Sequence, residues 1–246
     1  MTKSHNNPPA SGWAHNRGSG AKKSDVVMKL EGVCKVYKMG EESLYALNKV
    51  DLEIRRGEFI GIIGPSGSGK STLLNMLGLL DIPSCGRIML DGTDITRLSE
   101  KELAYLRGKK IGFIFQMFNL IPSLTVLENV TLPATIYEED KKESEKRATG
   151  ILEGIDMGER LHHYPNQLSG GQRQRAAIAR SLINNPEIIL ADEPTGNLDT
   201  KTGQEVLRRF KELHGEGKTI IIVTHDPDVA KITGRTIHVV DGKVQK

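Results

Sequence analysis

The stretch EFIGIIGPSGSGKSTLLNML, residues 58–77, decides the fold. Its first part is an apolar run typical of a buried strand, and its last part places leucines on one face of a helix. Between them stands the pattern G-x-x-x-x-G-K-[ST], whose fixed positions are Gly64, Gly69, Lys70 and Ser71. Glycines at a strand-to-helix turn let backbone N–H groups curl around an anion without side chains in the way. The stretch therefore predicts a phosphate-binding loop.

The side chains of such a loop have separate tasks. Lys70 would bridge the β- and γ-phosphates of a nucleotide, and the Ser71 hydroxyl would ligate Mg²⁺. A glycine-rich turn that binds nothing is the alternative, but the strand before the motif and the helix after it supply the context that phosphate binding requires. The residues expected to contact the nucleotide in this loop are Gly64, Pro65, Ser66, Gly67, Ser68, Gly69, Lys70, Ser71 and Thr72.

A second stretch, EIILADEPTGNLD (residues 187–199), contains a short apolar run that ends in two carboxylates. The run predicts a buried strand, and parallel α/β sheets bind their ligands at the carboxyl ends of strands. Asp192 is expected on the metal side of the site, through a coordinated water, and Glu193 is expected to orient and deprotonate an attacking water. A pair of surface caps is the alternative, which an apolar strand beside a phosphate loop disfavours. The reaction class is then attack of water on a γ-phosphate.

The rest of the chain alternates between strand and helix patterns. The expected elements are strands beginning near Val26 and at 46–54, a helix-rich stretch at about 118–182, a helix around 204–213, a buried strand at 219–223 and closing strands near 236–244. This alternation predicts an α/β fold with a parallel sheet.

Composition and charge argue against several classes of protein. No apolar run of the sequence reaches the ~18–20 residues of a membrane-spanning helix, and the first residues lack the apolar core of a signal peptide, so a cytoplasmic location is expected. The net charge of +3 gives no reason to expect nucleic acid as a partner. Cys34 and Cys85 fit no metal or redox spacing and are expected to be reduced thiols without chemistry.

The stretch LSGGQRQR, residues 168–175, predicts a second anion site. Ser169 precedes two glycines and a helix-like run, and the N–H groups at a helix start attract anions. An ordinary serine N-cap is the alternative, which accounts for Ser169 but not for the Gly-Gly-Gln that follows. Since the chain already has a better phosphate site, the stretch raises the question of which phosphate it serves.

Six motifs in a fixed order resemble those of the nucleotide-binding subunits of ATP-binding-cassette (ABC) transporters, from about Val26 to the C-terminus. They are GPSGSGKST, IGFIFQ ending at Gln116, LSGGQ, LADEP, GNLD and IIIVTHD with His225. The resemblance implies a P-loop NTPase: a RecA-like core with a parallel sheet, an antiparallel β lobe at its edge, and a helical lobe at about residues 117–182 that carries LSGGQ. It implies ATP and Mg²⁺ as cofactors and ATP hydrolysis as the reaction.

The resemblance also answers the question of the second anion site. In such proteins the signature loop contacts the nucleotide held by the other copy of a head-to-tail dimer, which forms in the ATP-bound state. The residues expected to make this contact are Ser169, Gly170, Gly171 and Gln172. Asp199 would cross the dimer interface.

Three further roles follow from the resemblance. Tyr37, in KVYKMG, lies where the family places an aromatic ring against adenine, although alone it would more often be a strand residue facing solvent. Gln116 would contact the metal and the attacking water, and His225 would hydrogen-bond the γ-phosphate. The expected metal ligands are Ser71, Gln116 and Asp192, and the expected catalytic residues are Lys70, Gln116, Glu193 and His225.

The stretch FNLIPSLTVLENVTLP (residues 118–133) and LADEPTGNLD look like the lipoprotein-releasing, macrolide-exporting and cell-division branch of the family. That likeness implies an integral membrane permease as partner, which would hold the chain at the cytoplasmic face of the cell membrane. Cargo export and mechanical work without transport both stay open. The chain departs from the branch in Arg173, where glutamine is common, and in a long tail, residues 1–24, expected to be disordered. Residues 25–246 would form the cassette domain.

Two other functions compete with this interpretation. A cassette ATPase of DNA maintenance or translation would carry long heptad coiled coils, zinc modules or a second cassette. The sequence between Lys70 and Ser169 has no sustained heptads and no cluster of cysteines, and the set of motifs occurs once in this sequence. A P-loop kinase would need an acceptor site and has no use for LSGGQ. The expected function is therefore ATP hydrolysis coupled to a membrane partner, with no nucleic acid involved.

Overall fold

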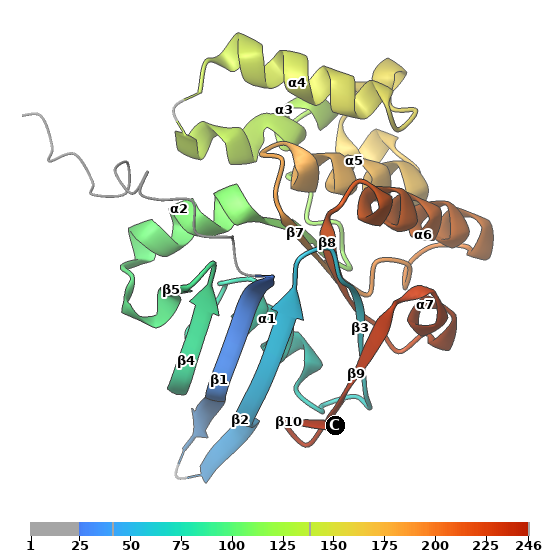
Figure 1. Cartoon of the computed structure of the whole chain (residues 1–246). Coiled ribbons are helices and arrows are strands. Elements are labelled where there is room, and N and C mark those ends of the chain that lie inside the picture. The colour runs from blue at the N-terminus through green and yellow to red at the C-terminus, as the bar shows by residue number, and fades with distance from the viewer. Residues whose placement is uncertain (1–24, 41, 138, 246) are drawn as a thin grey trace, which may run out of the picture.

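The structure, a computed structural model, describes residues 25–40, 42–137 and 139–245. The tail expected to be disordered, residues 1–24, lies outside the described residues. Among the helices that are described, none combines the length and the apolar character needed to cross a membrane. The described chain folds around two sheets, and a group of helices lies at one end of them (Figure 1).

The central sheet has six strands in the order β10-β9-β3-β8-β7-β6. Neighbouring strands from β9 to β6 pair in parallel, and β10 closes one edge antiparallel to β9. The strands are β3 (Phe59–Ile63), β6 (Ile111–Ile114), β7 (Ile188–Asp192), β8 (Thr219–Val223), β9 (Arg235–Val240) and β10 (Lys243–Gln245). The predicted parallel sheet of a P-loop fold is therefore confirmed.

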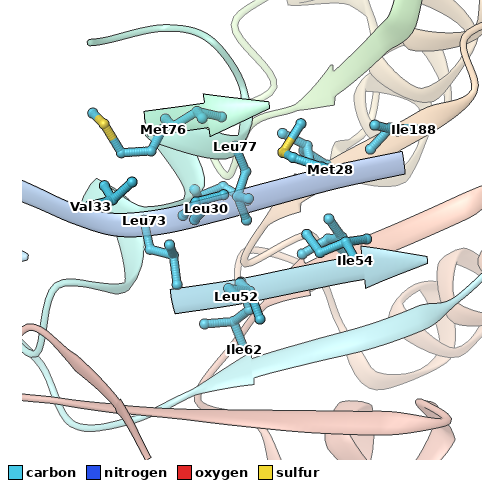
Figure 2. Packing of buried hydrophobic residues seen from close by; sticks show 14 of the residues in the cluster. Met28, Leu30, Val33, Leu52, Ile54, Ile62, Leu73, Met76, Leu77 and Ile188 are labelled. Carbon is cyan, nitrogen blue, oxygen red and sulfur yellow. The ribbon is translucent and has the colours of Figure 1, made fainter. Parts of the chain in front are cut away.

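Both faces of the central sheet are covered, as strands that are apolar on both sides require. Helix α1 (Lys70–Leu77) packs on one face, where Leu73 joins an apolar cluster shared with the second sheet (Figure 2). Helices α6 (Thr200–Gly215) and α7 (Pro227–Ile232) pack on the other face, around the fully buried Phe210. The phosphate-loop helix thus lies between the two sheets.

The second sheet is antiparallel, with the strand order β2-β1-β4-β5. Its strands are β1 (Val26–Met39), β2 (Glu42–Arg55), β4 (Cys85–Leu90) and β5 (Thr93–Asp94). The strand predicted at residues 46–54 is the buried half of β2. No element was expected from the sequence at β4, at β5 or at α2 (Glu100–Lys110), so this edge lobe is larger than the residue patterns alone indicated.

The helices after β6 form a group of their own, at the top of Figure 1. They are α3 (Val126–Thr131), α4 (Lys141–Glu153) and α5 (Gly170–Leu182), joined by the short 3-10 segments η2 (Leu132–Tyr137), η3 (Gly158–Arg160) and η4 (Pro165–Gln167), while η1 (Ile95–Arg97) precedes α2. Their apolar faces share one cluster that includes Val126, Leu152 and Ala176. The other side of α5 reaches the central sheet through Ile178.

The expectation of two separate reduced thiols is wrong. Cys34 and Cys85 occupy opposing positions on β1 and β4, with their Cα atoms 5.0 Å apart, and form a disulfide. The sequence could not reveal this pair, because 51 positions separate the two cysteines and only the antiparallel register of β1 and β4 brings them together.

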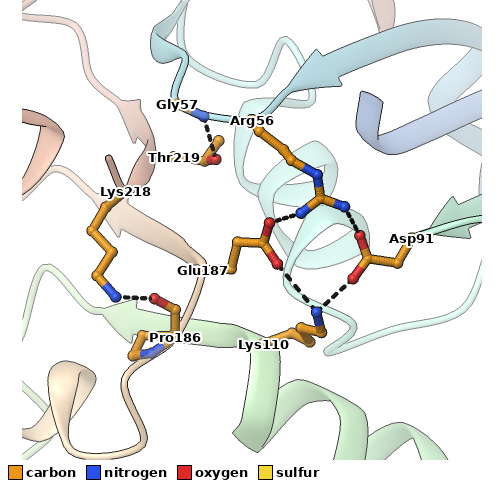
Figure 3. A network of polar contacts seen from close by, with 8 residues as sticks. All are labelled: Arg56, Gly57, Asp91, Lys110, Pro186, Glu187, Lys218 and Thr219. Atoms are coloured by element: carbon orange, nitrogen blue, oxygen red, sulfur yellow. Dashed lines mark hydrogen bonds and ion pairs between the residues drawn. The ribbon is translucent and has the colours of Figure 1, made fainter. Parts of the chain in front are cut away.

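A ring of four charged side chains joins the two sheets (Figure 3). Arg56 contacts both Asp91 and Glu187, and the Lys110 ammonium lies 2.5 Å from Asp91 and 3.1 Å from Glu187. Each carboxylate faces two cations, which offsets the cost of removing these charges from water. The ring lies where β3, β6 and β7 begin, so it fixes the sheets at the end opposite to the phosphate loop.

Candidate nucleotide-binding site

The loop between β3 and α1 accepts only glycine at two positions. A Cβ atom on Gly64 would lie 2.1 Å from the carbonyl oxygen of Val239, and one on Gly69 would lie 2.4 Å from that of Ala46. Gly69 also has a φ of 102°, in the left-handed region, and is the N-cap of α1. The loop therefore brings backbone N–H groups and the start of α1 to one point, which is the arrangement of an anion site.

Lys70 lies across this loop. Its Nζ atom donates to the carbonyl oxygens of Gly64, at 2.8 Å, and of Pro65, at 2.7 Å. The Ser68 side chain is buried inside the loop, whereas Ser71 is exposed at the start of α1. The Lys70 ammonium and the exposed hydroxyls of Ser66 and Ser71 are thus polar groups of the loop that a ligand could reach.

A cleft of about 700 Å³ opens in front of the loop, a volume within the usual range of small-molecule sites. The predicted residues that line it are Tyr37, Gly64, Ser66, Gly67, Gly69, Lys70, Ser71, Thr72, Gln116, Asp192, Glu193 and His225. They come from distant parts of the chain and meet because parallel strands place their carboxyl ends at one edge of a sheet. Of the predicted loop residues, Pro65 and Ser68 are not part of this lining.

Asp192 ends β7 beside the loop. Burial raises the pKa of the Asp192 carboxyl, the neighbouring charge of Glu193 raises it further, and Lys70 acts in the opposite direction. The raised pKa means that the surrounding protein does not supply enough positive charge to balance this carboxylate. A cation bound beside Asp192 would remove that deficit.

Glu193 is held in place by the residues that follow β8. The Thr224 hydroxyl lies 3.2 Å from Oε2, and the backbone N–H and Nδ1 of His225 lie 3.1 Å and 2.7 Å from Oε1. The backbone of Glu193 has a φ of 43°, which is uncommon for a residue with a side chain and marks local strain at functional sites. These contacts fix the carboxylate at the wall of the cleft.

Tyr37 and Gln116 reach the cleft from two further elements. Tyr37 lies on β1 with its ring at the cleft wall, and the Lys35 ammonium lies 5.4 Å from the centre of the ring. Gln116 follows β6 and is exposed, and its carbonyl oxygen accepts a hydrogen bond from Asn197 Nδ2 at 2.9 Å.

The residue patterns missed other parts of the cleft wall. Leu44 and Tyr45 on β2 line it beside Tyr37, and their side chains are more than half exposed. Asp241 and Gly242, in the turn between β9 and β10, line it from the other side. Large apolar residues in an exposed hairpin were the signal that could have indicated the first pair.

The signature residues stand apart from this cleft. Ser169 is the N-cap of α5, and it forms a capping box with Gln172, in which Ser169 Oγ accepts from the Gln172 N–H at 3.3 Å and Gln172 Oε1 accepts from the Ser169 N–H at 2.9 Å. A Cβ atom on Gly171 would lie 2.5 Å from Cγ2 of Thr202 on α6. Capping and packing therefore explain Gln172 and Gly171, which a serine cap alone does not. Within the described residues, neither these two nor Ser169 and Gly170 line the cleft.

Asp199 caps the next helix, α6. Its Oδ1 accepts from the Thr202 N–H at 3.0 Å and its Oδ2 accepts from the Thr202 hydroxyl at 2.6 Å, which lowers the pKa of the Asp199 carboxyl. Thr202 thus touches Asp199 and also faces Gly171. The starts of α5 and α6 lie together on one surface, and the exposed Ser169 leaves first-turn N–H groups of α5 available there.

A glycine loop under a lysine, with a strand-end carboxylate pair across from it, defines the class of P-loop nucleoside triphosphatases. The comparisons with known proteins agree with this class and narrow it. The family model of ABC transporters matches residues 47–196.

Similar proteins match most of the chain. The lipoprotein-releasing system ATP-binding protein LolD of Bacteroides thetaiotaomicron is 48% identical over 221 residues, which are 89% of this chain and 100% of that protein. The macrolide export ATP-binding/permease protein MacB of Bartonella henselae is 50% identical over 224 residues, which are 91% of this chain but 34% of that protein. A dimeric structure of the ATP-binding cassette MJ0796, in a post-hydrolysis state bound to ADP and Pi, has a TM-score of 0.83 at 50% identity and covers 89% of this chain and 97% of that one.

The chain therefore belongs to the ABC transporter family. It is an ATP-binding subunit of the ABC type, and it is an ATPase.

Proposed function

We propose that two copies of this chain form a head-to-tail dimer around two ATP molecules. The observation that carries the proposal is the separation of two helix starts on one chain: the phosphate loop before α1 lines the cleft, and the signature turn before α5 does not. In a head-to-tail pair each signature turn would close the cleft of the other copy. Ser169 and Gly171 would then contact the γ-phosphate, and Asp199 would lie at the interface. The dimeric structure of the similar cassette MJ0796 supports this assembly.

ATP would enter the cleft with its base toward β1 and its phosphates toward α1. The Tyr37 ring, next to the exposed Leu44 and Tyr45, offers an apolar surface on which adenine would stack. The loop N–H groups would surround the β-phosphate, and Lys70 would exchange its two carbonyl partners for the β- and γ-phosphate oxygens.

The residues around the phosphates also fit a magnesium ion. Mg²⁺ prefers oxygen ligands and is usually held by few protein groups together with phosphate oxygens and water. Ser71, Gln116 and Asp192 supply a hydroxyl, an amide and a carboxylate at this cleft. The raised pKa of Asp192 indicates that a cation there is favourable. Bound Mg²⁺ would neutralise charge on the β- and γ-phosphates.

Hydrolysis would proceed by attack of water on the γ-phosphate. Glu193 would accept the proton of the attacking water, and Gln116 would orient that water. Lys70 and His225 would stabilise the charge on the γ-phosphate oxygens as the bond to the β-phosphate breaks, so that ADP and inorganic phosphate are released.

The chain would use this cycle to drive a separate integral membrane permease, which would hold it at the cytoplasmic face of the membrane. Support comes from LolD and MacB, whose names describe lipoprotein release and macrolide export. MacB combines ATP-binding and permease parts in one protein, and this chain matches about a third of it. We therefore place the chain in the lipoprotein-release and macrolide-export type, with residues 25–246 as the cassette domain and about 117–182 as its helical lobe.

A cassette ATPase that performs mechanical work without cargo, as in cell-division control, is the alternative. It uses the same ATP cycle, so the site itself does not separate the two. The two functions differ in the membrane partner and in what that partner does outside the membrane.

Tagged Glu193→Gln protein, recovered from detergent-solubilised membranes with and without ATP, tests the membrane partner, which mass spectrometry would identify. A protein with few membrane spans and a large extracytoplasmic domain is the expected result. Recovery of only soluble or nucleic-acid-bound proteins would contradict the transporter function and leave the ATPase chemistry intact. Co-purification of a lipid-modified or small-molecule cargo would favour export over mechanical work.

A further inference from the structure

The loop that follows Gln116 is a tight turn fastened to helix α5. Phe118 and Asn119 both have left-handed backbone, with φ values of 62° and 49°. Arg180, near the end of α5, donates from Nη2 to the Phe118 carbonyl oxygen at 2.8 Å and from Nη1 to that of Asn119. Because an arginine keeps its charge in proteins, both are charge-assisted hydrogen bonds.

Two more side chains hold the same loop. The guanidinium of Arg173 lies 5.4 Å from the centre of the Phe118 ring, which is a cation–π contact. Arg173 precedes Arg180 by about two helical turns, so both arginines project from one side of α5. From the other direction, Asn197 donates to the carbonyl oxygen of Gln116 itself at 2.9 Å. Arg173 therefore also holds this loop against α5.

Helix α5 carries the signature turn at its start and Arg180 near its end. Buried alanines, Ala176, Ala177 and Ala179, line its middle, so that it packs closely along its length. A regular helix in a close-packed environment shifts as one body rather than bending. A displacement at Ser169 is therefore a displacement at Arg180 as well.

We propose that Arg180 and Arg173 are positioning residues that make the Gln116 loop follow α5. When the signature turn of one copy engages the nucleotide of the other, α5 would carry Gln116 to its working position in the cleft of its own chain. This inference rests on the proposed dimer. It makes each chain a link between the two nucleotide sites, so that ATP hydrolysis becomes cooperative.

A double-mutant cycle on the full chain tests the link. Arg180→Met removes the donors and keeps the length of the side chain, and Gln116→Ala removes the group that is positioned. We expect each single variant to lower kcat about tenfold, with the KM for ATP within about threefold of the unaltered chain. If Arg180 acts through Gln116, the double variant is as slow as Gln116→Ala alone. If instead the factor by which the double variant lowers kcat equals the product of the two single factors, the inference is overturned.

Conservative and control variants distinguish positioning from a general loss of structure. Arg180→Lys keeps one charged donor and should recover part of kcat and of the cooperativity, and Arg173→Gln should lower kcat about two- to threefold. Arg147 is the matched control, because its Nε donates to a backbone carbonyl beyond the end of α5, that of Ile183, at 2.7 Å. Arg147→Met should leave kcat and the Hill coefficient for ATP unchanged, and an equal loss there would overturn the inference.

Dimer formation separates this inference from the function on which it rests. With ATP, Glu193→Gln and Glu193→Gln/Arg180→Met should both dimerise and show the same circular dichroism. If Glu193→Gln stays monomeric, both the proposed dimer and the positioning of the Gln116 loop by α5 are refuted. If both proteins dimerise but the losses of kcat in Arg180→Met and Gln116→Ala multiply in the double variant, only the positioning role of Arg180 is refuted. If Arg180→Met does not fold, Arg173→Gln replaces it in the cycle, with the same two outcomes.

Discussion

The Nδ1 atom of His225 lies 2.7 Å from Oε1 of Glu193, so the residues that follow two adjacent parallel strands, β7 and β8, are joined at the wall of the cleft. The sequence predicted a contact from His225 to the γ-phosphate but not this one. The two are compatible, since a bond at Nδ1 fixes the ring and would direct Nε2 toward the phosphate. His225 would thus orient the proposed base and stabilise the developing charge.

Loss of this histidine should therefore affect turnover more than binding. We expect His225→Ala to lower kcat about 100-fold, with a much smaller change in the affinity for ATP, because one oriented donor and the support of Glu193 are lost together. Steady-state phosphate release and equilibrium ATP binding measure the two effects. His162→Ala, an exposed histidine among the helices, is the control. A His225→Ala protein with unaltered kcat would contradict the assignment.

Lys70→Ala should largely abolish ATP hydrolysis. The ammonium that would neutralise the β- and γ-phosphates is removed, so binding weakens as well as catalysis. ATP should then no longer raise the melting temperature, because stabilisation by a ligand depends on its affinity. Lys101→Ala, an exposed lysine on α2, should keep the ATP-dependent shift. A Lys70→Ala protein that hydrolysed ATP at an ordinary rate would refute the site.

Gly171→Ala should destabilise the fold although alanine favours helices. Its Cβ would meet Cγ2 of Thr202 at 2.5 Å, and overpacking of this kind costs about 1–3 kcal/mol. The companion Thr202→Ser removes that methyl group and keeps the hydroxyl bound to Asp199, so the double variant should recover most of the loss. Denaturant unfolding gives both values. An unrelieved loss in the double variant would mean that Gly171 is required for another reason.

The charged ring gives a pH dependence of stability. Burial alone would raise the pKa of Asp91, but Lys110 and Arg56 hold it below the usual value. A lowered pKa in the folded state contributes stability above the unfolded value of about 4, and that stability is lost as the pH falls through the folded pKa. Asp91→Asn should therefore lower the melting temperature at pH 7 and reduce its fall between about pH 4 and pH 2. The control is Asp25→Asn, in the more exposed pair with Arg55, which should leave the melting temperature at pH 7 unchanged.

The phosphate loop and the carboxylate pair could be predicted because their signals are local. A strand, a glycine turn and a helix follow one another in the chain at Gly64 and Gly69, and steric limits allow no other residue at those two positions. Asp192 and Glu193 follow an apolar run directly, so the cleft is where the sequence indicated.

The remainder depends on contacts between distant segments. The Cys34–Cys85 disulfide, the Leu44 and Tyr45 wall and the bond from His225 to Glu193 arise from strand register, which no local pattern encodes. Capping and packing depend on partners too: Gly171 and Gln172 of the signature proved to have structural reasons, so these two residues are weaker support for an anion site than the pattern alone suggested.

The central claim is that the signature turn of one copy completes the phosphate loop of another. Light scattering of Glu193→Gln protein with Mg-ATP tests it most directly, because loss of the base would slow turnover about 10²–10⁴-fold and preserve the ATP-bound state. A second sample carries Ser169→Arg as well, and a third carries Ser99→Arg, which removes a capping box of the same kind on α2.

We predict a dimer for Glu193→Gln, a monomer when Ser169→Arg is added and a dimer when Ser99→Arg is added. A monomeric Glu193→Gln protein, or a dimer that Ser169→Arg leaves intact, would contradict the account.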